Sequence, residues 1–125
     1  MKHFTIILAL LMTLSSPVMA QNLANNFRTD VVLKGYKAGD METSISFVVH
    51  ILTVNQSLSI ANELAEVKGV KLYCPASNVP ITTDVLHEVV SVEMMNARTR
   101  GDYDFFASKP FAFTALMTLV KFFPC

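Results

Sequence analysis

The sequence predicts an all-α domain, a compact bundle of four to five helices in which one disulfide ties the C-terminus to a central loop. Apolar residues recur every three or four positions in several segments, while alternating strand patterns joined by hairpin turns are missing. Two cysteines support the disulfide: Cys74 lies in the middle of the chain, and Cys125 is its last residue.

The first 20 residues are predicted to be a secretory signal peptide. They combine a short polar start with an apolar stretch over residues 4–14, too short to span a bilayer, and a cleavage-like sequence at 18–20. The remaining residues, 21–125, have the length of one domain. We therefore expect a single exported domain located in the periplasm.

The charge balance argues against a nucleic-acid partner. The chain has 10 basic and 10 acidic residues and a formal net charge of zero. Binding to nucleic acid or to an anionic membrane surface calls for clustered Lys and Arg, and no such cluster is present. We expect no nucleic-acid binding and no membrane contact beyond export.

Two cysteines allow only one intramolecular pairing. Export to an oxidising compartment favours the Cys74–Cys125 disulfide, which would close a loop of about 52 residues and stabilise the fold by roughly 4 kcal/mol. The alternative is a pair of buried, unpaired thiols.

The first half of the chain predicts three helices. The first covers residues 22–37, where apolar side chains recur every four residues, at Leu23, Phe27 and Val31. Gly35 and Gly39 weaken its C-terminal end. Asp40 could cap the second helix, whose apolar stripe is Ile45, Val48, Val49 and Leu52. Residues 47–52 could also form a buried strand, because β-branched residues crowd there. The third helix covers residues 57–67 and stops at Gly69.

The second half predicts an irregular connection followed by two helices. Pro75 and Pro80 exclude a helix between residues 70 and 80. The clearest helix follows, with Thr82 or Thr83 as its cap, Asp84 in its first turn, a polar end over residues 96–101, and an apolar stripe of Leu86, Val89, Val90, Met94 and Ala97.

A last helix is predicted to start near Ser108, with Pro110 in its first turn. Its predicted apolar face consists of Ala112, Ala115, Leu116, Leu119, Val120 and Phe123.

No catalytic residue, metal site or cofactor is predicted. His87, near Asp84 and Glu88, could belong to a metal or acid–base site, but a surface histidine is the simpler interpretation, and His50 fits a core or interface position. Cys74 has no local signature of a nucleophile. The methionines that could bind Cu(I) are scattered: Met41, Met94, Met95 and Met117. A binding protein, not an enzyme, is expected.

Two polar loops are candidate partner-binding surfaces. One mixes both charge signs with an aromatic residue, as interface hot spots do: Arg98, Arg100, Asp102, Tyr103 and Asp104. The other carries Ser77 and Asn78 between prolines that stiffen it and lower the ordering cost of binding. Both loops could instead be ordinary solvated connections.

The second half also carries a family resemblance. Tyr73-Cys74-Pro75, then the Thr-led helix over residues 81–90, then the Ala- and Leu-rich helix over 112–119, and finally Phe123-Pro124-Cys125 resemble the periplasmic immunity proteins of type VI secretion systems, the resistance-associated Rap/Tai group. The first half departs from that pattern. Where members carry a second cysteine pair, this sequence has Gly35 or Tyr36 and a residue near Ser44.

The resemblance implies a non-enzymatic inhibitor that binds a secreted, peptidoglycan-degrading effector and blocks its active-site cleft. The typical target is a cysteine amidase, and such inhibitors are often homodimers. A small periplasmic stress chaperone or assembly factor with one disulfide and an apolar helical surface is the alternative.

Overall fold

The computed structural model describes residues 27–37, 40–78 and 80–125 of the 125-residue chain. The predicted signal peptide, Leu23 and Gly39 lie outside these residues. Within them the chain forms five helices and no strand, which confirms the all-α prediction: α3 (Thr29–Gly35), α4 (Met41–Val67), α5 (Thr83–Arg100), α6 (Tyr103–Ala107) and α7 (Phe111–Phe122).

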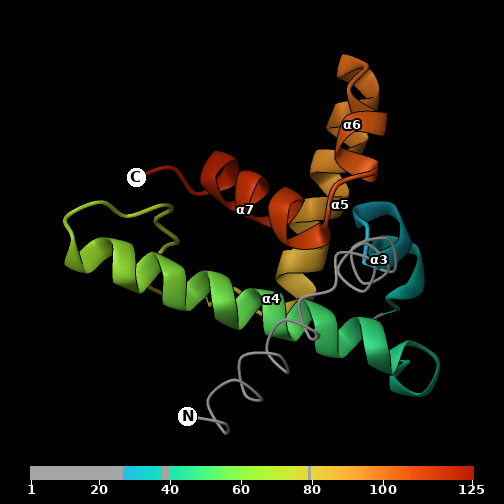
Figure 1. Ribbon diagram of the computed structural model, residues 1–125, viewed down its shortest axis with the longest axis horizontal. Coiled ribbons are helices and arrows are strands. Elements are labelled where there is room, and N and C mark those ends of the chain that lie inside the picture. The colour runs from blue at the N-terminus through green and yellow to red at the C-terminus, as the bar shows by residue number, and fades with distance from the viewer. Residues whose placement is uncertain (1–26, 38–39, 79) are drawn as a thin grey trace, which may run out of the picture.

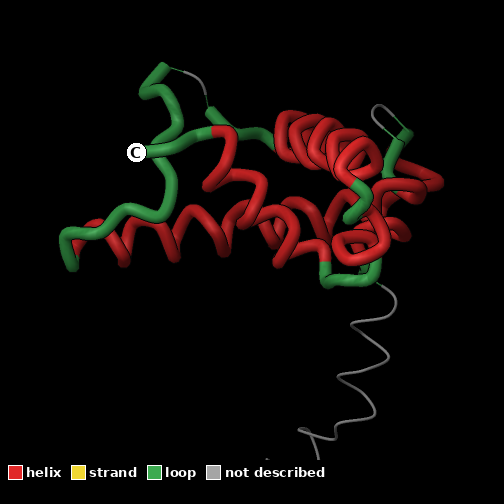
Figure 2. The backbone as a smooth tube through the Cα atoms, turned by 90° about the horizontal axis from the view of Figure 1, so that it is seen from above, coloured by secondary structure: helices red, strands yellow, loops and turns green. Residues whose placement is uncertain are grey.

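The longest helix, α4, is the base of the fold. In Figure 1 it runs along the lower edge, α5 rises away from it, and α7 crosses between them. Its second half extends beyond the other helices, and the segment that follows turns back over it (Figures 1 and 2). The core between the helices centres on fully buried side chains: Val32, Ile51, Leu86, Val90, Phe111 and Leu119.

The prediction of two separate helices over residues 40–67 is wrong, because α4 is one continuous helix of 27 residues, about 40 Å long. The strand alternative for residues 47–52 is also excluded. No glycine or proline occurs between Met41 and Val67, so nothing in the sequence interrupts the helical hydrogen bonds.

The buried face of α4 also differs from the prediction. Ile45, Val49 and Leu52 of the predicted stripe are exposed, and Val48 is only partly buried. The residues that face the core are Ser44, Phe47, Ile51, Val54, Leu58 and Asn62. Apolar residues lie on an exposed side of this helix as well as on the buried side, so their spacing alone does not identify the side that packs.

Helix α5 confirms its prediction closely. The Thr82 hydroxyl oxygen accepts a hydrogen bond from the Val85 backbone N–H at 3.2 Å, as an N-cap does. Gly101 ends the helix with a φ of +87°, a conformation that glycine adopts without strain. Four predicted stripe residues are buried and the fifth packs against them: Leu86, Val90, Met94 and Ala97, with Val89.

The last predicted helix, expected to start near Ser108, corresponds to α7, and a short helix that was not predicted precedes it. The short helix α6 comes first, and α7 begins at Phe111 with Pro110 just before it. The buried face of α7 contains Ala115 and Leu119 as predicted, whereas Ala112 and Val120 are exposed. Two threonines take buried places instead, and each finds a partner for its hydroxyl: Thr114 with Thr29 at 2.7 Å, and Thr118 with the Thr114 carbonyl at 2.7 Å.

Candidate partner-binding groove

A groove of about 640 Å³ lies between the second half of α4 and the segment of residues 71–81, which we call the connection. Ser77 and Asn78, predicted as partner-binding residues, line this groove. The other lining residues comprise polar side chains of α4 and further residues of the connection: Asn55, Gln56, Ser59, Asn62, Glu63 and Glu66; Lys71, Tyr73, Pro75, Ala76, Pro80 and Ile81.

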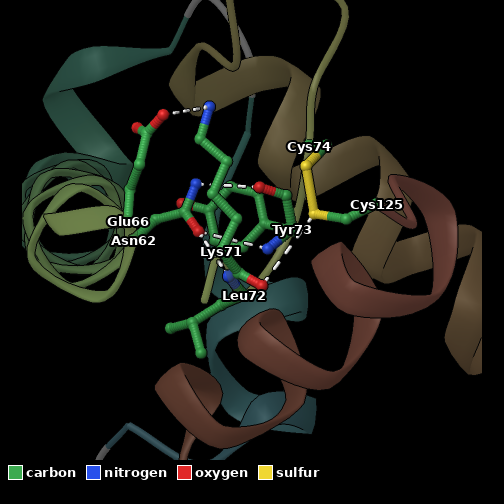
Figure 3. The surroundings of a disulfide bond; sticks show 7 residues. All are labelled: Asn62, Glu66, Lys71, Leu72, Tyr73, Cys74 and Cys125. Atoms are coloured by element: carbon green, nitrogen blue, oxygen red, sulfur yellow. Dashed lines mark hydrogen bonds and ion pairs between the residues drawn. A yellow bond between two sulfur atoms is a disulfide. The ribbon is translucent and has the colours of Figure 1, made fainter. Parts of the chain in front are cut away.

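Asn62 holds the start of the connection against α4. Its side-chain nitrogen donates to the Tyr73 carbonyl at 2.8 Å, and its oxygen accepts from the backbone N–H groups of Leu72 and Tyr73 at 2.8 and 3.1 Å. Figure 3 shows this side chain reaching from α4 to the two residues that precede Cys74. Asn62 is only 8% exposed, so these hydrogen bonds are shielded from water. One buried side chain therefore satisfies three backbone groups of an irregular segment.

Asn55 holds the other end of the connection. Its side-chain nitrogen donates to the Ile81 carbonyl at 2.7 Å, one residue before the cap of α5. Asn55 and Asn62 are seven residues apart, so they lie on the same side of α4, about 10 Å from each other along its axis. Both ends of the connection are thus tied to one helix.

The disulfide fixes the connection from the opposite side. Cys74 and Cys125 are bonded, with their Cα atoms 4.9 Å apart, which confirms the predicted pairing and excludes unpaired thiols. The Cys74 backbone N–H also donates to the Phe123 carbonyl at 2.8 Å. The segment after α7 and the connection therefore lie side by side.

The side chains that face the groove remain available to a partner. Gln56, Ser59, Glu63, Ser77 and Asn78 make no side-chain hydrogen bond or ion pair to any residue that the structure describes. Glu66 forms an exposed ion pair with Lys71 at 3.1 Å. Burial, together with the charge of Glu63, raises the pKa of Tyr73. The groove carries two carboxylates against one ammonium group, which favours a partner segment with a positive charge or hydrogen-bond donors.

The other predicted loop is largely engaged within the chain. The Arg100 guanidinium contacts the Glu93 carboxylate at 2.7 Å and Asp102 at 3.4 Å, and Lys121 of α7 contacts Glu93 at 2.8 Å. Burial alone would raise the pKa of Glu93, but hydrogen bonds and charge from Lys121 and Arg100 outweigh it and lower that pKa. Arg100 thus belongs to a network that joins α5 to α7.

The remaining residues of that loop form a smaller surface. The Arg98 guanidinium lies over the Tyr103 ring, 4.5 Å from its centroid, and Asp104 is exposed in the first turn of α6. Ser77 and Asn78 precede α5, whereas Arg98 to Asp104 lie in and just after its last turn, so about 25 Å of helix separates the two sets. The structure does not bring the two predicted surfaces together.

The two histidines both take part in packing. His50 stacks on Phe27, with ring centroids 4.0 Å apart, as predicted for a core residue. His87, predicted to lie on the surface, is half-buried instead, with its ring centroid 4.5 Å from that of Tyr36. Tyr36 donates a hydrogen bond to Asp84, and burial together with this carboxylate raises its pKa to about 12. In the part of the chain that the structure describes, no three metal-binding side chains cluster.

The two asparagines that shape the groove were not predicted as site residues. An asparagine within a helical pattern is usually a solvated residue, and Asn62 lies in the segment predicted as a separate third helix. The only signal in the sequence is that Asn55 and Asn62 are two helical turns apart.

No protein-family model, no curated protein and no solved structure matches this chain. The resemblance of residues 73–125 to the type VI immunity proteins stays a prediction.

Proposed function

We propose that this chain is a periplasmic immunity protein, which binds a cell-wall-degrading type VI secretion effector of the peptidoglycan amidase type and blocks its active-site cleft. The observation that carries the proposal is the way the connection is attached beside the groove. It is tied at both ends by asparagines and near its start by a disulfide, while Ser77 and Asn78 are exposed between these attachments.

A connection held in this way suits an inhibitor. Binding a partner restricts loops and side chains, and a loop that is already fixed loses less conformational entropy when it binds. The disulfide also fits the oxidising compartment in which such an effector acts. An immunity protein must bind tightly, with nanomolar or better affinity, and a few well-placed residues usually supply most of that free energy.

The test is co-purification of the full chain with the product of its neighbouring gene, followed by a peptidoglycan-degradation assay. A stable complex that abolishes wall degradation supports the proposal. No complex with a neighbouring wall-active protein contradicts it.

Matched variants then test the groove. Asn78→Arg places a bulky cation in the connection and should weaken binding at least tenfold. Asn96→Arg makes the same change at an exposed position on α5 and should leave affinity unchanged. Asp104→Arg reports on the second loop. Equal affinity of Asn78→Arg and the unchanged protein would exclude the connection from the interface.

A small periplasmic chaperone is the second candidate, because α4 exposes apolar side chains along its length, among them Ile60 and Leu64. A chaperone would suppress aggregation of unrelated denatured proteins at substoichiometric or equimolar ratios. An immunity protein would not.

A further inference from the structure

One acidic side chain of the groove has no partner of opposite charge. Glu63 is exposed on α4, and its carboxylate forms no ion pair or hydrogen bond with any residue that the structure describes. The other carboxylate, Glu66, is already paired with Lys71, whose side chain reaches across to it in Figure 3. Lys71 is the one basic residue among the described residues that line the groove. The charge of Glu63 is therefore not compensated by another side chain.

A tyrosine hydroxyl without a hydrogen-bond partner belongs to the same groove. Tyr73 is only 3% exposed and its backbone is held by Asn62, but its hydroxyl makes no hydrogen bond to any described residue. This hydroxyl is not fully enclosed, and Tyr73 lines the groove, so a ligand in the groove can reach it. Burial and, next, the charge of Glu63 raise the pKa of Tyr73, so the two side chains are within electrostatic reach of each other. Polar groups of buried side chains normally have a partner, which suggests that a ligand supplies the missing one.

The connection leaves room for a ligand beside these two groups. Its ends are tied to α4 at Asn62 and Asn55, about 10 Å apart along the helix, whereas the eight residues that lead from Tyr73 to Ile81 could extend to about 26 Å. The middle of the connection therefore stands away from α4, as Figure 2 shows. The resulting space of about 640 Å³ is within the range of protein sites that enclose a ligand.

We propose that the groove holds a lysine or arginine side chain of the effector, whose cationic group binds between the Glu63 carboxylate and the Tyr73 hydroxyl, a place that we call the cation site. This rests on the proposed function, since it names the group of the effector that the groove recognises. A partner that covers the groove takes water away from Glu63, and an ionised carboxylate that loses water without gaining a counter-charge is costly. The partner must therefore supply a positive charge there.

The atoms of the cation site suit an ammonium or guanidinium group. Such a cation only donates hydrogen bonds, the carboxylate only accepts them, and a phenol oxygen can accept one as well. Hydrogen bonds to an ionised partner are stronger than neutral ones. Further along the groove, Ser59 and Gln56 lie about one and two helical turns before Glu63, where they can hydrogen-bond the backbone on either side of the cationic residue.

The first test uses the full-length chain, exported with its own N-terminal segment and purified from the periplasmic fraction, with acetyl-Ala-Arg-Ala-amide as the probe. In two-dimensional NMR this peptide should shift the amide signals of residues 59–66 and 73–78. The same peptide with citrulline, which keeps the shape of arginine without its charge, should bind about tenfold more weakly. Glu63→Gln should remove this preference, and Glu88→Gln, a matched change at an exposed carboxylate of α5, should leave it intact.

Tyr73→Phe separates recognition from stability. The hydroxyl has no partner within the described chain, so its removal should leave the free energy of unfolding unchanged and still weaken binding of the arginine peptide. Four results would overturn the proposal: equal binding of the two peptides, a preference that survives in Glu63→Gln, unchanged binding by Tyr73→Phe, or no shift at up to about 20 mM peptide.

The complex with the effector distinguishes the cation site from the proposed function. Glu63→Gln should weaken that complex about tenfold. A complex that is equally tight in this variant would overturn the cation site and leave the proposed function standing. No complex at all, with the arginine preference present, would contradict the proposed function and support the cation site.

Discussion

Replacing Asn62 by alanine should test whether the connection depends on one buried side chain. The change removes all three hydrogen bonds that join α4 to Leu72 and Tyr73. Tyr73 is 3% exposed, so its backbone N–H and carbonyl cannot readily turn to water instead. Two buried backbone groups would lose their only side-chain partner.

The expected loss of stability follows from the number of hydrogen bonds removed. At about 1 kcal/mol for each hydrogen bond, Asn62→Ala should lower the free energy of unfolding by about 3 kcal/mol. This is a large part of the 5–15 kcal/mol that stabilises a typical domain. For a domain of about 100 residues, the melting temperature should fall by about 12 °C or more.

Thermal and urea unfolding followed by circular dichroism measure this effect. Gln56→Ala, an exposed change on the same helix, should alter stability by less than about 0.5 kcal/mol, and Asn55→Ala, which loses one hydrogen bond, by about 1 kcal/mol. Asn62→Asp adds a sharper test. At neutral pH the carboxylate of this variant places an acceptor against the Tyr73 carbonyl, whereas its protonated form at acid pH can donate a hydrogen bond there. The difference in unfolding free energy between this variant and the unchanged protein should therefore shrink as the pH falls.

Unfolding of Asn62→Ala within about 0.5 kcal/mol of the unchanged protein would refute this reasoning. It would also be refuted if amide hydrogens in the second half of α4 exchanged no faster in Asn62→Ala than in the unchanged protein. Either result would mean that the disulfide alone positions the connection.

Three further outcomes are expected. Cys125→Ser should lower stability by roughly 4 kcal/mol, since the bond joins residues 51 positions apart, and a melt unchanged by reducing agent would contradict this. Gly35→Ala places a Cβ 2.1 Å from the Phe47 ring and should lower the free energy of unfolding by about 1–3 kcal/mol. Adding Phe47→Leu to this variant should restore part of that free energy, and additive effects of the two changes would argue against the contact. Burial lowers the pKa of both His50 and His87, so the folded protein favours their neutral forms. The free energy of unfolding should therefore be highest above a pH of about 6.5 and decline as the pH falls below it. Equal melting temperatures at pH 7.5 and 5.5 would exclude this.

Local signals in the sequence predicted the second half of the chain well. Thr82, Gly101 and the stripe of α5 act through neighbours on the same helix, and the disulfide had only one possible pairing. These features depend on residues a few positions apart or on simple counting, so they can be read without the tertiary structure.

The first half was predicted less well because α4 carries apolar residues on an exposed side as well as on the side that packs. Its spacing supports several stripes, and the side that packs is chosen by α5 and α7, which lie far away in the sequence. Ser44 and Asn62 show the difficulty, since both are polar and yet buried. Asn62 is buried because its partners are backbone groups of the connection, and a sequence does not show which irregular segment returns to which helix.

The disulfide also changes what a single proteolytic cut can do. Residues 76–78 are exposed and lie outside the helices, so a protease can reach them, and they lie between Cys74 and Cys125. A cut anywhere between these cysteines leaves two polypeptides still joined through sulfur, with α5, α6 and α7 retained on the same molecule. A nicked copy would therefore run as one chain on a non-reducing gel and as two on a reducing gel, and the disulfide would hold its two pieces together.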